Sequence, residues 1–426
     1  MQFIYNNSGI NELKINKLRA ELSEYIIYCK AGVQERNYEM EEAALCLTDD
    51  KNILKEVLRM VDRKKTEKLK YIINIGIGGS NLGTKAVYDA LYGTVDIFQQ
   101  SRYPKIIFLD TTDPEYLFQF DQFFKESITQ ESEVIINIIS KSGGTIETAV
   151  NGEIVLHLFK DKFKNWKERC VITTDKNSQL WDNATIAGID VLEIPKKVGG
   201  RYSIFSPVGL FPLALCGIKV EKLLLGATIM RDRCLKQEED KNIALTSAAI
   251  LYEHLKEEVV INDNFYFHME FESLGKWYRQ LMGESIGKNG TGTTPTVSIG
   301  STDLHSIVQL YLGGPKNKYT SFISTNLFKE YNLSSLNVLT HIKEIEGKSA
   351  GDIMKAIQQG TIMTYKNLNL PYTETILETI NEEEIGAYMQ FKMNEIMFLG
   401  SLMKVNAFDQ PQVELYKTET EKILGG

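Results

Sequence analysis

The sequence has little cysteine, and none of it is arranged in pairs. Its five cysteines are scattered over 426 residues, odd in number and free of a CxxC spacing. A disulfide framework needs paired cysteines, and a structural zinc site needs ligands at close, regular spacing. We therefore predict neither a disulfide framework nor a metal site, and a reducing, cytoplasmic location is expected.

Long apolar runs are also missing. Residues 1–18 lack a basic segment followed by an apolar one, and the most apolar later stretch, 204–218, is interrupted by serine, proline and glycine. A secretory signal needs those two segments in that order, and a membrane span needs about 20 mostly apolar residues. Neither is predicted.

A surplus of basic residues is absent as well. Lysine and arginine number 48 against 56 aspartates and glutamates, which gives a formal net charge of −8. General nucleic-acid binding normally needs a concentrated basic surface, so it is not expected. A small phosphorylated ligand needs only local donors and remains possible. With 43% hydrophobic and 24% charged residues, the composition is that of a globular chain of two or three domains.

Short β-rich runs alternate with helical stretches from Tyr71 onward. The runs are YIINIGIG, KIIFLD, EVIINIIS, CVITTD and DVLEIP, and several of them are apolar at consecutive positions, which is typical of strands covered on both faces in a parallel sheet. They predict a first α/β domain over residues 71–198. NFYFHME, TVSIGS and YTSFIST predict a second one over 199–350. Residues 1–70 and 351–426 are expected to be helical extensions, the latter packing on both domains.

Two strand–loop–helix junctions in the first domain carry glycine, serine and threonine. They are INIGIGGSNLG, with Gly79 and Ser80, and IISKSGGTIET, with Ser140, Ser142 and Thr145. Such loops present backbone N–H groups and hydroxyls to an anion at a helix N-terminus. Neither has the complete dinucleotide fingerprint or the ending of a nucleotide P-loop. They favour a small phosphorylated ligand without a cofactor, although each loop alone is equally compatible with a simple tight turn.

A helix is predicted just before the segment GESIGKNGTG. Leu274, Trp277 and Leu281 recur at helical spacing, and Gln280 and Glu284 lie four residues apart on one side. Glu284 is thereby aimed inward. Because burying a carboxylate without a partner is costly, Glu284 is either a packing defect or a functional group.

Four further residues are candidates only in combination. Arg201 follows two glycines, which permit close backbone approach, so its guanidinium can stabilise an oxyanion; the alternative is a surface arginine. His305 follows the strand TVSIGS, and strand ends in this fold class carry sites, although a single histidine is more often structural. Gln410 and Lys417, in FDQPQVELYK, would ordinarily be solvated.

Five segments together resemble the glucose-6-phosphate isomerase (phosphoglucose isomerase) family. GIGGSNLG, SKSGGTIET, GGRYSIFSPVG, GESIGKNGTG with DLHS, and FDQPQVELYK occur in the family's order. The resemblance implies two sugar-isomerase (SIS-type) α/β domains, each a parallel-sheet αβα sandwich, with N- and C-terminal helical extensions. It also implies a cofactor-free interconversion of glucose 6-phosphate and fructose 6-phosphate in glycolysis and gluconeogenesis, by a cytoplasmic homodimer.

The resemblance also assigns roles to residues. Glu284 would move the proton through a cis-enediol(ate), Arg201 would steady that intermediate, and His305 and Lys417 would open the ring. The family's histidine comes from the neighbouring subunit, so His305 would serve the other chain's sugar. The substrate-binding residues implied are Gly79, Ser80, Ser140, Lys141, Ser142, Gly143, Gly144, Thr145, Gln280 and Gln410.

One position departs from the family's pattern. The phosphate loop usually has a Thr-Thr or Ser-Thr pair where this chain has Gly144-Thr145. One hydroxyl is lost, and the Gly144 amide is expected to replace it in part, with weakened phosphate binding.

Two other functions are alternatives. One is a non-catalytic sugar-phosphate sensor of the SIS type, which would have no use for Glu284 with His305 and normally accompanies a DNA-binding or effector domain. The other is an amino-sugar isomerase, which needs an ammonia-supplying half that this chain has no room for.

Overall fold

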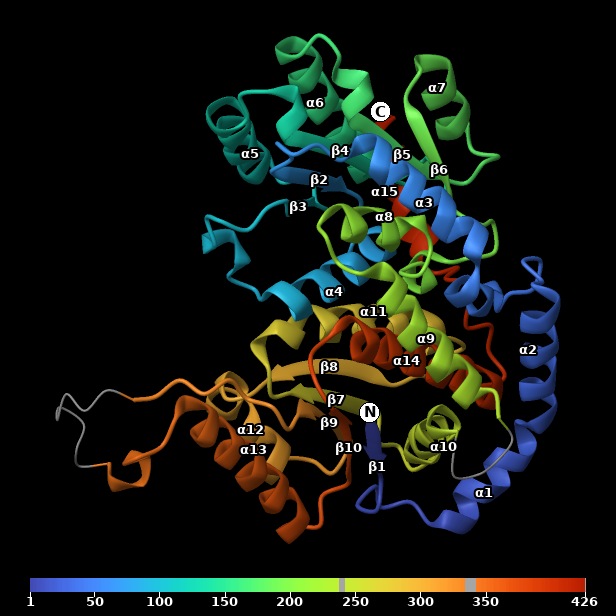
Figure 1. Ribbon diagram of the computed structural model, residues 1–426. Helices are drawn as coiled ribbons and strands as arrows, with labels where there is room; N and C mark the ends of the chain where they lie inside the picture. Colours follow the sequence, from blue (N-terminus) through green and yellow to red (C-terminus); the bar gives the residue numbers. More distant parts are fainter. Residues whose placement is uncertain (237–241, 334–341, 426) are drawn as a thin grey trace.

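Two five-stranded sheets form the centres of two α/β units, one above the other in Figure 1. The computed structural model describes residues 1–236, 242–333 and 342–425. Helices cover both faces of each sheet, so the predicted α/β class with two parallel-sheet sandwiches is confirmed. Within the described residues, no helix is both long enough and apolar enough to cross a membrane.

The first sheet has the order β3-β2-β4-β5-β6 and is parallel throughout. Its strands fall on the five predicted runs, and every residue of β4 and β5 is buried, as expected for strands covered on both faces. The chain runs outward from β2 to β3 and then returns past β2 to β4, so the order reverses between β2 and β4. The strands are β2 (Tyr71–Ile75), β3 (Lys105–Leu109), β4 (Val134–Ile139), β5 (Cys170–Thr174) and β6 (Asp190–Glu193). The connecting helices are α4 (Leu82–Tyr92), α5 (Pro114–Ser127), α6 (Ile146–Lys162) and α7 (Gln179–Ala187).

The second sheet has the order β1-β10-β9-β7-β8, with only β1 antiparallel. The helix α11 covers the face toward the first unit, and α12 and α13 cover the opposite face (Figure 1). The strands are β7 (Ile261–Tyr266), β8 (Thr294–Ile299), β9 (Lys318–Thr325), β10 (Tyr372–Leu377) and β1 (Gln2–Ile4). The helices are α11 (Glu272–Ile286), α12 (Val308–Gly313) and α13 (Ala350–Asn367).

Two strands of this sheet come from regions that were predicted to be helical extensions. β1 belongs to residues 1–70 and β10 to residues 351–426. β1 has three residues, too few to show any period. β10 is the short segment YTETIL between two long helices, and its threonines alternate with other residues rather than forming an apolar run. The range 199–350 therefore lacks two of the strands that complete the second sheet.

The remaining helices wrap the side of both units and fill the space between them. In Figure 1, α1 to α3 run along one side of the molecule, and α9, α11 and α14 lie between the sheets. These helices are α1 (Glu12–Glu21), α2 (Ser23–Glu35), α3 (Lys51–Lys64), α8 (Pro207–Leu215), α9 (Val220–Cys234), α10 (Ile243–Lys256), α14 (Glu382–Met403) and α15 (Val413–Leu424).

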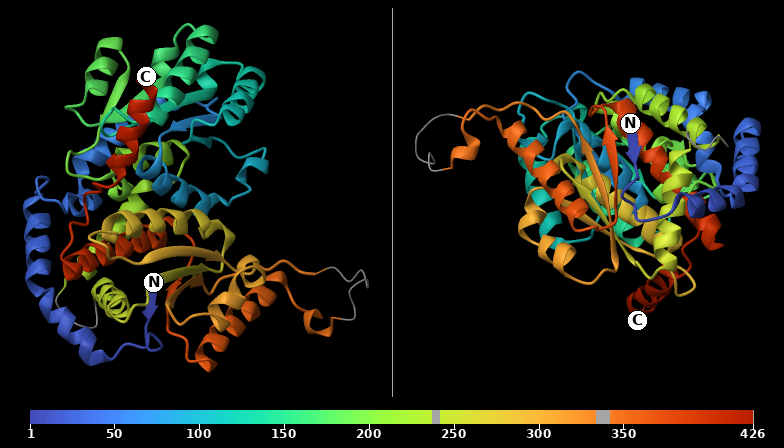
Figure 2. Two further views of the ribbon diagram at one scale, coloured as in Figure 1. Left: turned by 180° about the vertical axis from the view of Figure 1, so that it is seen from behind. Right: turned by 90° about the horizontal axis from the view of Figure 1, so that it is seen from below.

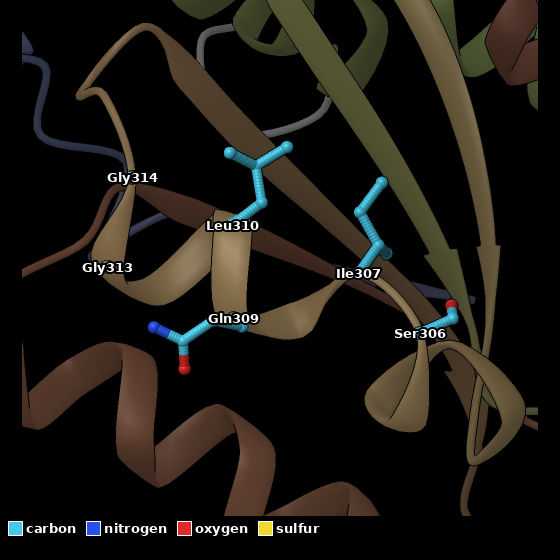
Figure 3. A pocket seen from close by; sticks show the side chains of 6 residues that line it. All are labelled: Ser306, Ile307, Gln309, Leu310, Gly313 and Gly314. Atoms are coloured by element: carbon cyan, nitrogen blue, oxygen red, sulfur yellow. The ribbon is translucent and has the colours of Figure 1, made fainter.

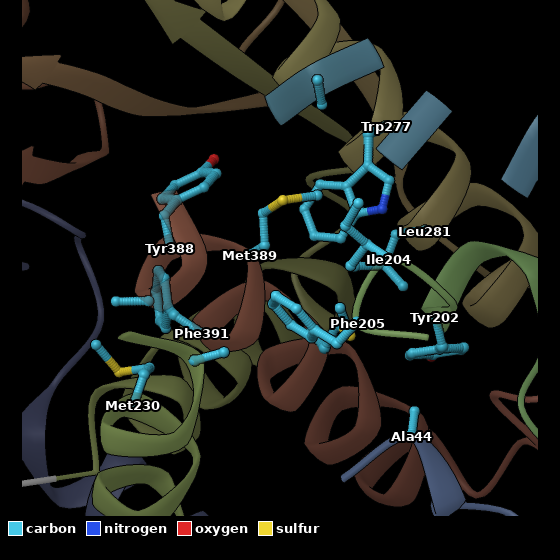
Figure 4. Close-up of a cluster of buried hydrophobic side chains, with 14 of the residues drawn as sticks. Ala44, Tyr202, Ile204, Phe205, Met230, Trp277, Leu281, Tyr388, Met389 and Phe391 are labelled. Atoms are coloured by element: carbon cyan, nitrogen blue, oxygen red, sulfur yellow. The ribbon is translucent and has the colours of Figure 1, made fainter. Parts of the chain in front are cut away.

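The main core lies between the units and is built on α9, α11 and α14. Figure 4 shows Trp277 and Leu281 of α11 near Met389 of α14, all of them buried. The crossing of α9 and α14 requires two glycines. A Cβ atom on Gly226 would lie 1.9 Å from the Glu383 carbonyl oxygen, and one on Gly386 would lie 2.0 Å from that of Leu223. The two backbones therefore touch, which brings α14 close enough to support α11.

A buried ion pair lies within this core. Lys392 and Glu395 of α14 are almost completely inaccessible, with their charged atoms 3.0 Å apart. Burial lowers the pKa of Lys392, and the neighbouring carboxylate opposes that effect. Glu395 also accepts hydrogen bonds from Ser247 of α10 and from Tyr278 of α11. One carboxylate thus connects three helices, and its removal would leave a buried cation without a partner.

We expect Glu395→Leu to destabilise the protein by about 3–5 kcal/mol, because Lys392 would remain buried and uncompensated. The shift of the urea unfolding midpoint measures the effect. Glu272→Leu is the matched control, since Glu272 forms an exposed pair with Lys276 on α11 that contributes less than about 1 kcal/mol. Equal shifts for the two variants would contradict the importance of the buried pair.

Candidate active site

Two loops meet at the carboxyl edge of the first sheet. The 3₁₀ turn Gly78–Ser80 follows β2, and the loop 140–145 follows β4, which pairs directly with β2. The strand order reverses between these two strands, and the crevice at such a point is where open α/β sheets bind ligands. The structure therefore brings together the two loops that the sequence singled out.

The second of these loops presents hydroxyls and amides around one small space. Ser140 is buried, and its Oγ lies 3.2 Å from Thr145 Oγ1. Thr145 precedes the first turn of α6, and its side chain makes no capping hydrogen bond to that turn. Gly144 donates its N–H to Ser142 Oγ at 3.2 Å. The first-turn amides of α6 remain available to an anion.

Lys141 adds a cation to the same space. Burial lowers the pKa of its ammonium group, while the negative charge of Asp175 opposes the shift. Repulsion from Lys197 and, less strongly, from Arg201 also lowers the pKa.

Arg201 reaches this region because the backbone around it packs directly on the first loop. A Cβ atom on Gly79 would lie only 2.0 Å from the carbonyl carbon of Gly200, so no other residue fits at position 79 without moving one of the two loops. The glycine pair before Arg201 was predicted to allow close approach, and the structure shows that its partner is the Gly78–Ser80 turn.

The Arg201 side chain is buried and almost fully bonded, so it is no surface arginine. Its guanidinium touches the helix α11 on one side and the segment after α14 on the other. The acceptors are Ser285 Oγ (2.8 Å), Glu284 Oε2 (3.4 Å), Gln410 Oε1 (2.7 Å), the Ala407 carbonyl (2.7 Å) and the Asp409 carbonyl (3.0 Å). Four of these fix its position, and the longer contact to Glu284 faces the open site.

Glu284 lies in the last turn of α11, with its side chain 32% exposed. One carboxylate oxygen faces Arg201, and the other accepts a hydrogen bond from Gln280 Nε2 at 3.1 Å. Gln280 rests against Gly78, where a Cβ atom would lie 2.9 Å from its Nε2. Its own Oε1 is buried without a hydrogen-bond partner. The carboxylate is thus held between a cation and an amide, with part of its surface open.

His305 is not brought to Glu284 within one chain. The helix α11 runs back from the carboxyl end of β7 toward the start of β8, so Glu284 lies near the amino edge of the second sheet. His305 ends the 3₁₀ turn Thr302–His305, which follows the carboxyl end of β8. Six residues of strand, at about 3.3 Å each, put roughly 20 Å between the two edges. Within the described residues, the exposed side chain of His305 makes no hydrogen bond or ion pair.

A surface hollow lies beside His305. It has a volume of about 480 Å³ and is formed by α12 together with the residues just before and after that helix (Figure 3). Leu310 on its wall is 49% exposed. Its lining residues are Ser306, Ile307, Gln309, Leu310, Gly313 and Gly314.

Of the two C-terminal candidates, one is in the site and the other is near it. Gln410 bonds directly to Arg201. Lys417, on α15, pairs with Glu414 at 2.7 Å, and this hydrogen bond raises its pKa. The charge of Glu147, in the first turn of α6, raises the pKa slightly more.

Two residues of the site were not predicted. Ser285 accepts from Arg201, and the buried Lys288 donates to the carbonyls of Asn406 and Asp409. Both lie within GESIGK, next to Glu284, and polar residues at the buried end of an apolar helix are the signal that could have revealed them. In the part of the chain that the structure describes, no three His, Cys, Asp or Glu residues are arranged to hold a metal.

Comparison with known proteins gives consistent matches along most of the chain. The family model for phosphoglucose isomerase matches residues 51–425. A glucose-6-phosphate isomerase from Methanocaldococcus jannaschii is 35% identical over 344 residues, which cover 80% of this chain and 81% of the relative. One from Thermus thermophilus is 31% identical over 388 residues, covering 89% of each.

Two solved structures have the same fold over nearly the whole chain. A hypothetical protein from Thermus thermophilus superposes with a TM-score of 0.86, covers all of both chains and is 27% identical. A glucose-6-phosphate isomerase from Chlamydia trachomatis has a TM-score of 0.81 at 20% identity, covering 99% of this chain and 88% of that one. Together with the match over residues 51–425, these likenesses show that the chain belongs to the phosphoglucose isomerase family.

Proposed function

We propose that the chain catalyses the reversible interconversion of glucose 6-phosphate and fructose 6-phosphate. The observation that carries this proposal is the partly open carboxylate of Glu284, held between Arg201 and Gln280 beside the two loops at the switch point. The names of the relatives support the choice of substrate. The five free, buried cysteines fit a cytoplasmic enzyme.

Proton transfer between two neighbouring carbons requires one base that becomes an acid. Glu284 takes the proton from the carbon beside the carbonyl and returns it to the next carbon. Negative charge develops on the oxygens of the cis-enediolate in between. Arg201 is preorganised by its four other acceptors, so it stabilises that charge without moving, by an amount on the order of a few kcal/mol.

The phosphate holds the sugar at a distance from the reacting carbons. Ser140, Lys141, Ser142 and Thr145 bind it, together with the first-turn amides of α6. The amide of Gly143 adds a donor, while that of Gly144 already donates to Ser142 Oγ, and Gln280, Gly79 and Ser80 line the sugar. This binding energy positions the carbons next to Glu284. Because Gly144 lacks a hydroxyl, the loop offers one side-chain donor fewer than the family's usual pair.

We expect Glu284→Gln to lower turnover of fructose 6-phosphate by roughly 10²–10⁴-fold, since the proton carrier is lost. Formation of glucose 6-phosphate, coupled to its oxidation, measures turnover, and calorimetry measures binding. Binding should stay within about threefold, because the phosphate contacts are unchanged.

Glu272→Gln is the control, because it changes an exposed carboxylate of the same helix. Turnover of Glu284→Gln equal to that of the control would refute the assignment. Wild-type protein that binds the sugar phosphate without any turnover would instead indicate a sensor.

Ring opening needs groups that the described monomer does not bring to Glu284. We propose a homodimer in which His305 of each chain reaches the other chain's site, sharing ring opening with Lys417. Three features support it. His305 is exposed and unpartnered among the described residues, it lies at the sheet edge opposite Glu284, and the hollow beside it exposes Leu310.

We expect His305→Ala to impair cyclic sugars selectively. Activity on fructose 6-phosphate should fall by about 10²-fold, as for loss of a general acid or base. Activity on 5-deoxyfructose 6-phosphate, which lacks the hydroxyl that closes the ring, should fall by less than about threefold. Equal losses in kcat/KM on the two sugars would show that His305 has another role.

Mixing two inactive variants tests whether His305 crosses between subunits. After unfolding and refolding together, half of the Glu284→Gln and His305→Ala dimers are hybrids, each with one site that has both residues intact. Recovery of up to about a quarter of wild-type activity is therefore expected. If His305 served its own chain, every site would carry one lesion and mixing would restore nothing.

A further inference from the structure

Two buried cations converge on the segment that follows α14. Lys288 donates its ammonium to the carbonyls of Asn406 and Asp409 and to the Asp409 carboxylate, the last at 2.6 Å. Arg201 donates to the carbonyls of Ala407 and Asp409. Lys288 is only 8% exposed, so its ammonium charge is satisfied mainly by these acceptors rather than by water. The backbone of this segment is therefore oriented by charge.

Apolar contacts place the same segment but do not orient its end. Ala407 is buried against Gly400, and the Phe408 ring lies 5.4 Å from that of Tyr202. The carbonyl of Asp409, which follows Phe408, accepts hydrogen bonds from both Arg201 and Lys288. Gln410 follows directly and reaches Arg201 with its side chain.

The helix α15, which carries Lys417, has no buried residue of its own. Leu415 is 68% exposed and Tyr416 is 56% exposed. Its ion pairs join Lys417 to Glu414 and Lys422 to Glu419, both within the helix. Figure 2 shows α15 projecting from the body of the molecule. Packing on its own chain therefore holds α15 only weakly, and the segment before it must set its direction.

We propose that Lys288 is a positioning residue, which clamps residues 406–409 and so aims Gln410 and Lys417 at the sugar. This inference rests on the proposed function, in which Lys288 has no role so far. Lys288 touches no substrate. Lys288 lies four residues beyond Glu284, just after α11. Its ammonium connects the end of α11 to residues 406–409. Both halves of the site thus move as one unit.

The variant Lys288→Met tests this, because methionine keeps an unbranched side chain and removes the charge and the donors. Hydrogen exchange should show residues 411–424 losing most of their protection, while α11 and α14 keep theirs. Activity on fructose 6-phosphate should fall by roughly tenfold or more, as when a general acid is misplaced. Activity on 5-deoxyfructose 6-phosphate should fall by less than about threefold, since Glu284 and Arg201 keep their other contacts.

Lys276→Met is the matched control, because Lys276 is an exposed lysine on the helix α11, which ends just before Lys288, and it pairs with Glu272. A second variant, ending the chain after Gln412, removes α15 and leaves the clamp intact. It should reproduce the selective loss on the cyclic sugar, and this arm does not depend on whether Lys288→Met folds.

Three results would overturn the proposal. They are unchanged exchange of residues 411–424 in Lys288→Met, equal losses on both sugars, and full activity of the shortened chain. The hydrogen-exchange measurement needs no turnover. It therefore tests whether Lys288 fixes the C-terminal segment even if no isomerase activity is found.

Discussion

The site depends on one buried guanidinium. A cation removed from water must be surrounded by acceptors, and Arg201 finds them on α11 and on the segment after α14. Its position in turn depends on Gly79, because only a glycine lets the first loop approach the Arg201 backbone so closely. Satisfying this one charge therefore brings together three distant parts of the chain: the first loop, the helix α11 and the segment after α14. Glu284 is a partly exposed acceptor with the longest of these contacts, and it is there that a ligand can compete.

The helix α11 is held from both sides. On its site face, Ser285 and Glu284 contact Arg201, and on its buried face Tyr278 donates to Glu395. Because Tyr278 and Glu284 are on the same rigid helix, rotation that would turn the carboxylate away must also break the buried hydrogen bond. Catalytic groups on rigid elements keep their geometry at little cost during reaction. The buried pair behind the helix therefore contributes to the site without touching it.

Sequence alone was sufficient for most of the strands and for the two loops at the switch point. Strands such as β3 and β4 contain consecutive apolar residues, which are typical of a sheet covered on both faces. The glycine and serine loops follow from their place between strand and helix. β1 and β10 were missed because three residues carry no period and YTETIL has no apolar run. Lys288 and Ser285 were missed for another reason: the local pattern shows only that polar residues lie at the buried end of α11, and their partners lie over 80 residues away.

His305 shows why a correct local rule can still leave a site incomplete. Strand ends do carry functional residues in this fold class, and His305 follows the end of β8. Yet in a parallel sheet the helix that follows β7 returns to the opposite edge before β8 begins, so Gln280 and Glu284 must lie at the amino edge. Residues at the two ends of one strand are too far apart for both to contact one small ligand, so Glu284 and His305 of one chain cannot act on the same sugar. Either the histidine has no part in the reaction or a second copy of the chain supplies it, and a closed twofold arrangement would supply two histidines to two sites at once.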